Sequence, residues 1–384
     1  MTDPPTIPAD PTPTGASTGP RPATARPGAP RHAPHRRSDA TGGDRRATIE
    51  DVAIAADVSV ATVSRALRNL PNVAESTRRR VEAVAADLRY RPDPAASRLA
   101  ARKTTTITVG VPSLSGWYFS TVVAGAEAVC NEAGYEFQVI AVSSLADRDR
   151  LLDDAHQLER RTDGLILVDV EATTHQADAL TRRGVALATI GHALDGHPAV
   201  RIDDRAVGRL AADHLVSLGH RRLGLIDGRG DDPMNFVVPV ERRTGFCDGL
   251  ADHGLELEAD HVANGNFDVD GGREAMRALL DTEHPPTAVF AMSDEMAFGA
   301  IMELDERDMR AGVDIAVMGV DDHEFSRVAR LTTIRQPVAD HGAVAARLLI
   351  ATMQGAPFDD GQHVRPSIEL VERESTHAAA RHGS

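Results

Sequence analysis

The sequence predicts a small all-α unit of short helices, followed by a much longer α/β region. Between residues 48 and 90, apolar side chains recur at the three- and four-residue spacing of helices. From residue 106 onward, short apolar runs alternate with helical stretches, which is typical of parallel sheets covered by helices on both faces. The chain has 384 residues, of which 42% are hydrophobic, so it can build two or three domains with apolar cores.

Residues 1–46 predict a disordered tail, because they are rich in proline and poor in apolar residues. They lack the pattern of a signal peptide, and no run of 18 apolar residues follows, so we expect a cytoplasmic protein without a membrane span. Cys130 and Cys247 lie far apart and are interpreted as small core residues.

The stretch 48–68 predicts two short helices joined by a tight turn. Thr48 followed by Asp51 resembles a capping box at the start of the first helix. The apolar face of that helix would contain Ile49, Val52, Ala53 and Ala56. The run 57–59 breaks the pattern, and Ser59 can then cap a second helix.

The second helix has two different faces. Its predicted buried stripe consists of Val60, Val63, Ala66 and Leu67. The opposite face carries Ala61, Thr62, Ser64, Arg65 and Arg68, and short polar side chains with arginine suit the DNA major groove. Taken alone, the same periodicity would also fit a helical hairpin that does not bind DNA.

A third helix is expected over residues 73–90, where Val81, Val84, Ala85 and Leu88 would complete a three-helix core. Pro94 suits the first position of another short helix over residues 94–101. The charge of this region differs from that of the rest of the chain. Residues 1–47 and 48–103 each carry a net charge of +3, and the net charge of the whole chain is −15, so the other 281 residues carry −21. A basic head on an acidic body would direct only one end of the chain toward phosphates.

The segments TIEDVA, VSVATVSRAL and TRRRVEAVAADLRYRP, with Leu99 after them, resemble the DNA-binding headpiece and hinge of the lactose-repressor (LacI/GalR) family. The resemblance covers about residues 47–376. It implies a helix-turn-helix headpiece (47–92), a hinge helix and linker (93–105), a two-lobed periplasmic-binding-protein-like, Rossmann-like effector-binding and dimerisation domain (106–376), and a tail (377–384).

The resemblance also implies which residues contact DNA. Val60, Ala61 and Arg65 would face base edges, with Arg65 able to bind guanine, and Leu99 would insert into the minor groove. Asp57 stands where the family has glycine, and we expect the turn to be kept because aspartate tolerates left-handed backbone better than most residues. The DNA-binding set is Thr48, Val60, Ala61, Thr62, Ser64, Arg65, Arg68, Thr77, Arg78 and Leu99, in which Thr77 and Arg78 would contact phosphates. Asp93 and Ser97-Arg98 depart from the family pattern of the hinge.

Seven apolar runs are the predicted strands: 107–111, 137–142, 165–168, 185–190, 223–226, 288–291 and 315–320. The family arrangement would divide them between two lobes joined by three crossovers, with a last strand over 368–374. The expected N-lobe is 106–202 with 337–353, and the expected C-lobe is 203–336 with 354–376.

The effector site is expected between the lobes, at the carboxyl ends of the strands. The loop after the first strand contains the only tryptophan, and we expect Trp117 and Tyr118 to contact a ligand while Phe119 packs the lobe. The resemblance adds Arg242, Phe267, Ser293, Asp294, Asp321 and Gln336. Arginine and aspartate in one small pocket suit a polyhydroxylated solute, although Arg242 and Asp321 could instead form salt bridges.

These observations predict a homodimeric transcription repressor that binds a near-palindromic operator and is controlled by a small metabolite, a sugar or sugar derivative. A nucleobase or a partner protein as effector, and activation in place of repression, remain open. A solute-binding protein of the same fold is a distant alternative, because such a protein would carry a signal peptide and would lack the basic head. An enzyme is not expected, because the sequence has no nucleophile elbow, phosphate loop or dinucleotide glycine fingerprint. No cofactor or metal is expected, since the histidines show no metal-ligand spacing.

Overall fold

The computed structural model describes residues 47–67, 71–90, 104–228, 234, 237–357, 359 and 363–376. They belong to two compact units, residues 1–91 and 92–384, and each unit is considered by itself. The predicted tails, Arg68, the hinge helix over 94–101 and its Leu99 lie outside the described residues. None of the helices in the described ranges combines the length and apolar character needed to span a membrane.

The first unit contains α1 (Ile49–Ala55), α2 (Val60–Leu67) and α3 (Glu75–Asp87). The predicted capping box is confirmed: the Thr48 hydroxyl accepts from the Asp51 amide, and the Asp51 carboxylate accepts from the Thr48 amide. The turn holds Asp57 at φ 49°, the left-handed conformation expected there. Ser59 Oγ accepts from the Thr62 amide at 3.1 Å and so caps α2.

The core of this unit forms where the three helices meet. Val52, Val63 and Val81 are fully buried there, one from each helix. Val60 is 41% exposed, so its placement in the buried stripe was wrong. It is the first residue of α2, one turn before Val63, and at that end of the helix the core no longer covers the side chain. Leu88, just past the end of α3, is 39% exposed for the same reason.

The first lobe of the second unit is built on a parallel sheet with strand order β11-β5-β4-β3-β1-β2. Its strands are β1 (Thr106–Val111), β2 (Glu136–Ala141), β3 (Gly164–Val168), β4 (Ala186–Ile190), β5 (Ala199–Val200) and β11 (His363–Val364). The helices are α5 (Trp117–Glu132) and α13 (Val338–Met353), which pack on each other, and α6 (Leu145–Leu152), α7 (Ala155–Leu158) and α8 (Thr174–Arg182). They pack in two separate apolar clusters, with α5 and α13 in one and α6, α7 and α8 in the other.

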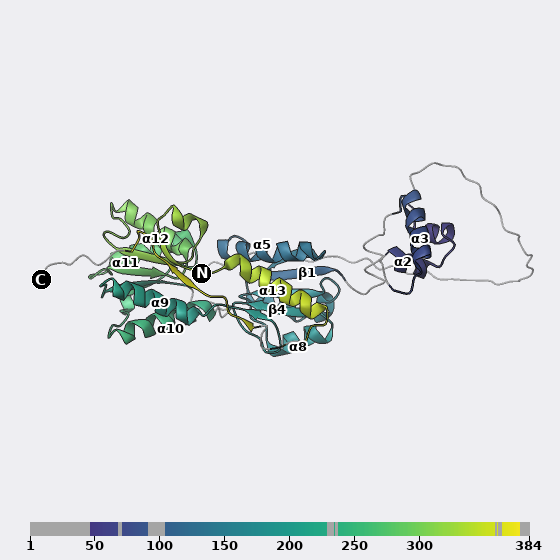
Figure 1. Cartoon of the computed structure of the whole chain (residues 1–384). Helices are drawn as coiled ribbons and strands as arrows, with labels where there is room; N and C mark the ends of the chain where they lie inside the picture. The colour runs from purple at the N-terminus through teal and green to yellow at the C-terminus, as the bar shows by residue number, and fades with distance from the viewer. Residues whose placement is uncertain are drawn as a thin grey trace, which may run out of the picture. The chain divides into compact units, whose positions relative to one another are not determined.

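The second lobe has strand order β12-β10-β9-β8-β6-β7. Its strands are β6 (Leu223–Asp227), β7 (Val262–Asn264), β8 (Ala288–Ala291), β9 (Ala316–Asp321), β10 (Thr332–Arg335) and β12 (Glu369–Val371), of which β12 runs antiparallel to β10. The helices α9 (Asp204–Ser217) and α10 (Val237–Asp252) cover one face, and α11 (Val269–Leu280) and α12 (Asp294–Glu306) cover the other (Figure 1). Two short 3-10 helices, η1 (Ala259–His261) and η2 (Glu324–Arg327), lie in loops.

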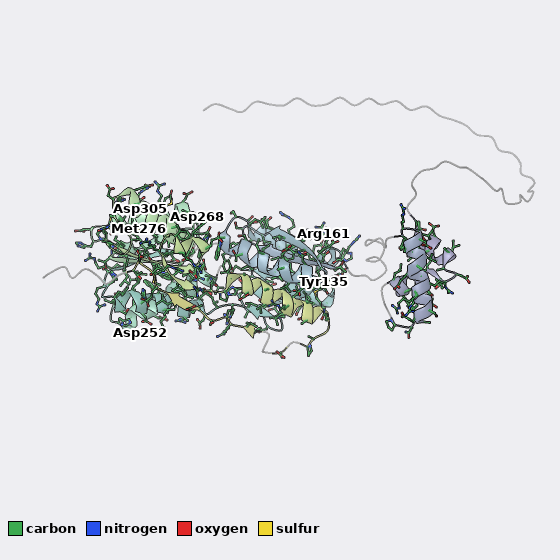
Figure 2. All side chains as sticks on the ribbon, turned by 45° about the horizontal axis from the view of Figure 1, so that its top comes forward. Tyr135, Arg161, Asp252, Asp268, Met276 and Asp305 are labelled. Atoms are coloured by element: carbon green, nitrogen blue, oxygen red, sulfur yellow. The ribbon has the colours of Figure 1, made fainter. Side chains whose placement is uncertain are left out.

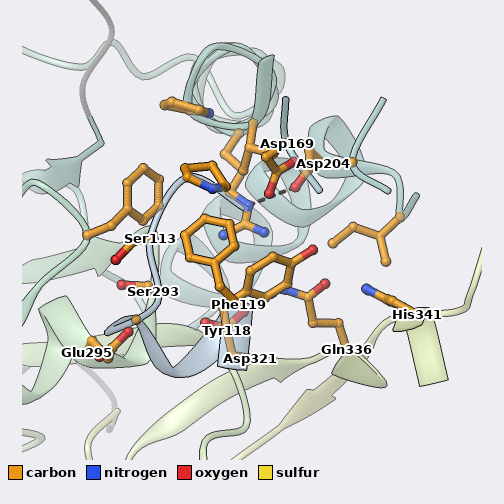
Figure 3. A pocket seen from close by; sticks show the side chains of 18 of the residues that line it. Ser113, Tyr118, Phe119, Asp169, Asp204, Ser293, Glu295, Asp321, Gln336 and His341 are labelled. Carbon is orange, nitrogen blue, oxygen red and sulfur yellow. Dashed lines mark hydrogen bonds and ion pairs between the residues drawn. The ribbon is translucent and has the colours of Figure 1, made fainter. Parts of the chain in front are cut away.

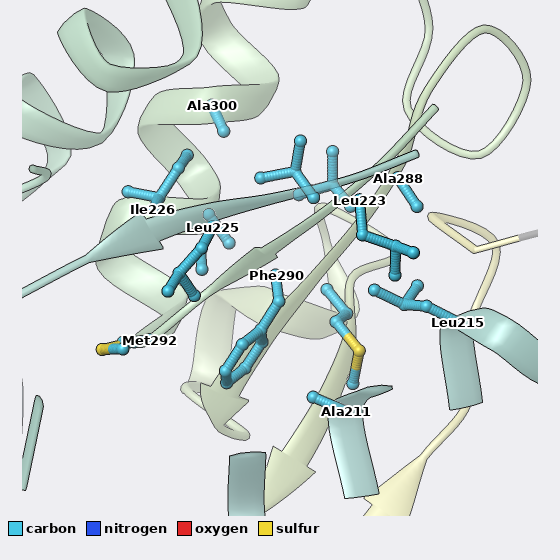
Figure 4. Close-up of a cluster of buried hydrophobic side chains, with 14 of the residues drawn as sticks. Ala211, Leu215, Leu223, Leu225, Ile226, Ala288, Phe290, Met292 and Ala300 are labelled. Carbon is cyan, nitrogen blue, oxygen red and sulfur yellow. The ribbon is translucent and has the colours of Figure 1, made fainter. Parts of the chain in front are cut away.

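The second lobe encloses the largest apolar cluster, centred on β6 and β8 (Figure 4). Phe290 of β8 and Phe246 of α10 are fully buried, with ring centroids 5.2 Å apart. Such packing makes this sheet a rigid support for the loops at its strand ends.

The chain crosses between the lobes three times. Two crossovers agree with the predicted positions, between β5 and α9 and between β10 and α13. The third crossover lies later in the chain than expected. The second lobe was predicted to resume at residue 354, but β11 still pairs with β5 in the first sheet, with Val364 opposite Val200. The return to the second lobe therefore falls between β11 and β12.

Candidate functional site

A cavity of about 220 Å³ lies between the lobes, at the carboxyl ends of the strands. Asp268, which caps α11, lies at the end of the second lobe that faces the first lobe, whereas Asp252 and Asp305 lie on outer surfaces (Figure 2). Both sheets thus present strand-end loops to the same cavity, as expected for ligand sites in α/β folds.

Six of the eight predicted effector residues line this cavity together: Tyr118, Arg242, Phe267, Ser293, Asp321 and Gln336 (Figure 3). Trp117 and Asp294 are not among the lining residues. The lining also includes Asp169, Glu295 and His341, which sequence reasoning missed, and Phe119, which was expected to pack the lobe. Asp169 directly follows β3, so the strand-end rule could have found it.

Arg242 lies on α10, with 5% of the residue exposed. Its Nε donates to Asp204 Oδ1 at 2.8 Å, and another guanidinium nitrogen donates to the Met292 carbonyl at 2.5 Å. Arg242 therefore forms a salt bridge, which was the alternative interpretation, and it also lines the cavity. The bridge ties α9 to α10 and holds a cationic group at the cavity wall.

Asp321 ends β9 and accepts a hydrogen bond of 2.5 Å from the Gln336 side-chain amide. Gln336 follows β10, so this bond joins the ends of two neighbouring strands. Burial raises the pKa of Asp321 to about 7, and the Arg242 guanidinium opposes that shift. Asp321 can therefore accept hydrogen bonds from a ligand, but it presents less than a full negative charge at neutral pH.

Asp169 enters the cavity from the first lobe at φ 50°. Its carboxylate lies directly against Gly191 at the end of β4, where a Cβ would overlap an Asp169 oxygen. Burial is the largest cause that raises the pKa of Asp169 to about 7; the Asp204 carboxylate also raises it, and Arg242 lowers it. Glycine at position 191 thus makes room for an acidic group in the cavity wall.

Tyr118 and Phe267 supply aromatic surface from opposite lobes. Tyr118 lies in the first turn of α5, and burial, followed by the charges of Asp169, Asp204 and Asp321, raises its pKa well above the usual value. The phenol therefore stays neutral and can donate a hydrogen bond. The Phe267 ring lies against Gly228, where a Cβ would overlap it.

Asp294 supports the scaffold of the second lobe and is fully buried. Its carboxylate accepts from the Ser326 hydroxyl at 2.6 Å, the Thr333 hydroxyl at 2.6 Å and the His323 amide at 2.8 Å. These bonds join α12 to β10 and to the loop after β9. The sequence places Asp294 at a strand end, but its side chain points into the lobe because those three donors surround it.

Trp117 does not line the cavity and instead contacts the second lobe. Its indole ring lies 4.5 Å from the His323 imidazole between centroids, with the ring planes 40° apart. Its backbone amide donates a hydrogen bond to the Glu295 carboxylate. Burial raises the pKa of Glu295, and this hydrogen bond opposes the shift. The first turn of α5 therefore forms contacts between the lobes through Trp117.

In the first unit, α2 exposes Ala61 and Arg65 and partly exposes Thr62 and Ser64, which is the face that sequence analysis assigned to DNA. Arg78 is different: its guanidinium donates to the Ala66 carbonyl at 3.4 Å, and its side chain is 14% exposed. Arg78 therefore ties α3 to the last turn of α2, in addition to any contact with phosphates.

Comparison with known proteins identifies this arrangement. Residues 48–93 match the model of the bacterial regulatory proteins of the lacI family, and residues 212–376 match a periplasmic binding protein-like domain. The chain is 32% identical to catabolite control protein A of Priestia megaterium, over 81% of this chain and 94% of the relative. The chain belongs to the lacI family of bacterial regulatory proteins. As a lacI-family member with the headpiece described above, it is a DNA-binding transcriptional regulator.

Other relatives and structures agree with the lacI-family assignment. The transcriptional repressor CytR of Escherichia coli strain K12 is 31% identical over 86% of this chain and 97% of the relative. The structure of the lac repressor dimer bound to operator and the anti-inducer ONPF has a TM-score of 0.73 and 28% identity, covering 87% of this chain and all of that one. A complex of the regulator CelR with cellobiose has a TM-score of 0.61 and 30% identity, covering 86% of this chain and all of that one.

Proposed function

We propose that this regulator is a homodimeric repressor whose affinity for a near-palindromic operator is controlled by an uncharged, polyhydroxylated effector, a sugar or sugar derivative, bound between the lobes. The observation that carries the effector assignment is the cavity itself, which combines buried hydrogen-bonding groups with aromatic surface. Buried donors and acceptors that need partners favour a ligand with many hydroxyl groups.

The charges of the lining support an uncharged ligand. Four acidic residues, Asp169, Asp204, Glu295 and Asp321, line the cavity together with two basic residues, Arg201 and Arg242. Arg242 already forms an ion pair with Asp204. An anionic ligand would therefore meet an excess of acidic groups.

A dimer is supported by apolar side chains that the second lobe leaves exposed. Phe325 is 60% exposed and Val328 is 80% exposed, both in or next to η2. Phe298 of α12 lies beside the same loop, because its ring and that of Phe325 both contact His323. Exposed apolar residues grouped in this way are typical of a protein–protein interface. A twofold dimer would present two headpieces to two half-sites.

The DNA side of the proposal is tested by footprinting the full-length protein on the fragment upstream of its own gene, with and without a panel of neutral sugars. We expect protection of two half-sites about one helical turn or more apart, and a change of affinity with one sugar. The affinity should fall steeply with salt concentration, because arginines displace counterions from phosphates. A monomer in light scattering, or no protected site at low salt, would contradict the proposal.

A further inference from the structure

His341 lies in the first turn of α13 and lines the cavity between the lobes, yet it is 1% exposed. Among the residues that the structure describes, neither of its ring nitrogens has a hydrogen-bond partner. Figure 3 shows the imidazole directed toward the cavity from the same side as Gln336. Buried polar groups without partners are rare in folded proteins, because each costs stability.

The position of His341 is held rigidly by the helix that carries it. A Cβ at Gly125 of α5 would overlap the Ala339 carbonyl oxygen, and a Cβ at Gly342 of α13 would overlap the Val122 carbonyl oxygen. These two glycines allow α5 and α13 to approach until their backbones touch. This close packing fixes the backbone of α13 next to His341, so the helix itself cannot shift to bring the imidazole to another partner without separating from α5.

The imidazole is uncharged at neutral pH, because burial lowers the pKa of His341 to about 4; Asp340 opposes this shift and Arg242 adds to it. A neutral imidazole offers one N–H donor and one nitrogen acceptor. A hydroxyl group is complementary to such a ring, because it can either donate to one nitrogen or accept from the other.

We propose that His341 is a specificity-determining residue of the effector cavity and binds a hydroxyl group of an uncharged, polyhydroxylated effector. This inference rests on the proposed function, since it assumes that the cavity takes such a ligand. It adds a direct ligand contact from α13, the helix that begins at the second crossover between the lobes.

The first experiment needs no effector. Thermal unfolding of the full-length His341→Leu variant is compared with that of the wild type. We expect the variant to be at least as stable, because leucine has a similar size and leaves no polar atom without a partner. A marked loss of stability would show that the imidazole has a structural partner, and would overturn the proposal.

The second experiment is calorimetric titration with D-ribose, cellobiose and glucose 6-phosphate. For a neutral sugar that binds the wild type, we expect His341→Leu to weaken binding by about 10-fold or more. His341→Asn keeps one donor and one acceptor and should lose less. His192→Leu is the matched control, because His192 Nε2 is also buried without a partner but His192 does not line the cavity.

Equal affinity of the wild type and His341→Leu for the same sugar would overturn the role of His341 while leaving the proposed function intact. Preferential binding of glucose 6-phosphate would overturn the uncharged effector class. Absence of binding by the wild type to all three probes would count against the proposed effector, whereas the unfolding experiment would still decide whether the imidazole has a partner within the fold.

Discussion

The indole of Trp117, in the first lobe, contacts the imidazole of His323, in the second lobe, with 4.5 Å between ring centroids. His323 also contacts Phe298 and Phe325, so a small aromatic cluster crosses the boundary between the lobes. An aromatic pair of this kind contributes about 0.5–1.5 kcal/mol beyond its buried area. The contact therefore favours the arrangement of the lobes seen here.

The Trp117 contact predicts an optical signal for lobe movement, since this is the only tryptophan in the chain. His323→Ala should expose the indole and shift the fluorescence emission maximum to longer wavelength. For an effector that binds the arrangement of the lobes seen here, His323→Ala should also weaken binding by about 2- to 10-fold, because this arrangement becomes less populated when the Trp117 contact is lost. His253→Ala, which removes an imidazole paired with Asp213 elsewhere on the second lobe, is the control. An unchanged spectrum in His323→Ala would rule out the contact in solution.

The raised pKa of Asp169 predicts how stability depends on pH. In the folded state this carboxyl titrates at about pH 7, whereas in the unfolded chain an aspartate titrates at about 3.9. Between these values the folded state binds more protons, so the free energy of unfolding falls as pH rises. Asp169→Asn should reduce this fall and should be more stable than the wild type at pH 8. Urea denaturation at several pH values, with Asp305→Asn as an outer-surface control, measures the effect; a pH dependence like that of the wild type would contradict it.

Arg242 and Asp204 form a buried ion pair, with side chains 6% and 10% exposed. Arg242→Met should lower the free energy of unfolding by about 3–5 kcal/mol, because it leaves a buried carboxylate without its partner. The double variant Arg242→Met/Asp204→Leu should recover much of this loss. Denaturant titration gives both values.

The same two helices provide a matched control for this pair. Arg205 of α9 pairs with Asp248 of α10 in an exposed bridge, and Arg205→Met should cost less than about 1 kcal/mol. Similar losses at Arg205 and Arg242 would mean that burial does not determine the strength of the inner bridge.

Arg65 projects from the exposed face of α2. Arg65→Ala should cost about 1–3 kcal/mol of binding free energy at one base pair of the operator and relax the preference there. Arg79→Ala serves as the comparison, since its side chain is 77% exposed and lies on α3, outside the recognition helix. Gel-shift titrations on operator and random DNA distinguish the two roles; an equal loss on both DNAs for Arg65→Ala would exclude base reading.

Features that depend on neighbours along the chain could be predicted from the sequence. The Thr48–Asp51 capping box, the left-handed turn at Asp57 and the Ser59 cap each involve residues within a few positions. Among the described strands of three or more residues, all except β7 and β10 were predicted, whereas β5 and β11, of two residues each, have no periodicity to detect.

Contacts between distant segments decided what the sequence could not. Trp117 and Tyr118 are adjacent, yet one ring packs on His323 and the other lines the cavity, because consecutive residues of a helix point in directions about 100° apart. Asp294 is bonded to three groups from other segments, and His341 lines the cavity from α13, a helix that packs closely against α5. The sequence by itself determined the family, the two-part organisation and six of the residues that line the cavity. The tertiary structure decided which of those side chains are already bonded and which still lack a partner, because that depends on groups brought together from remote parts of the chain.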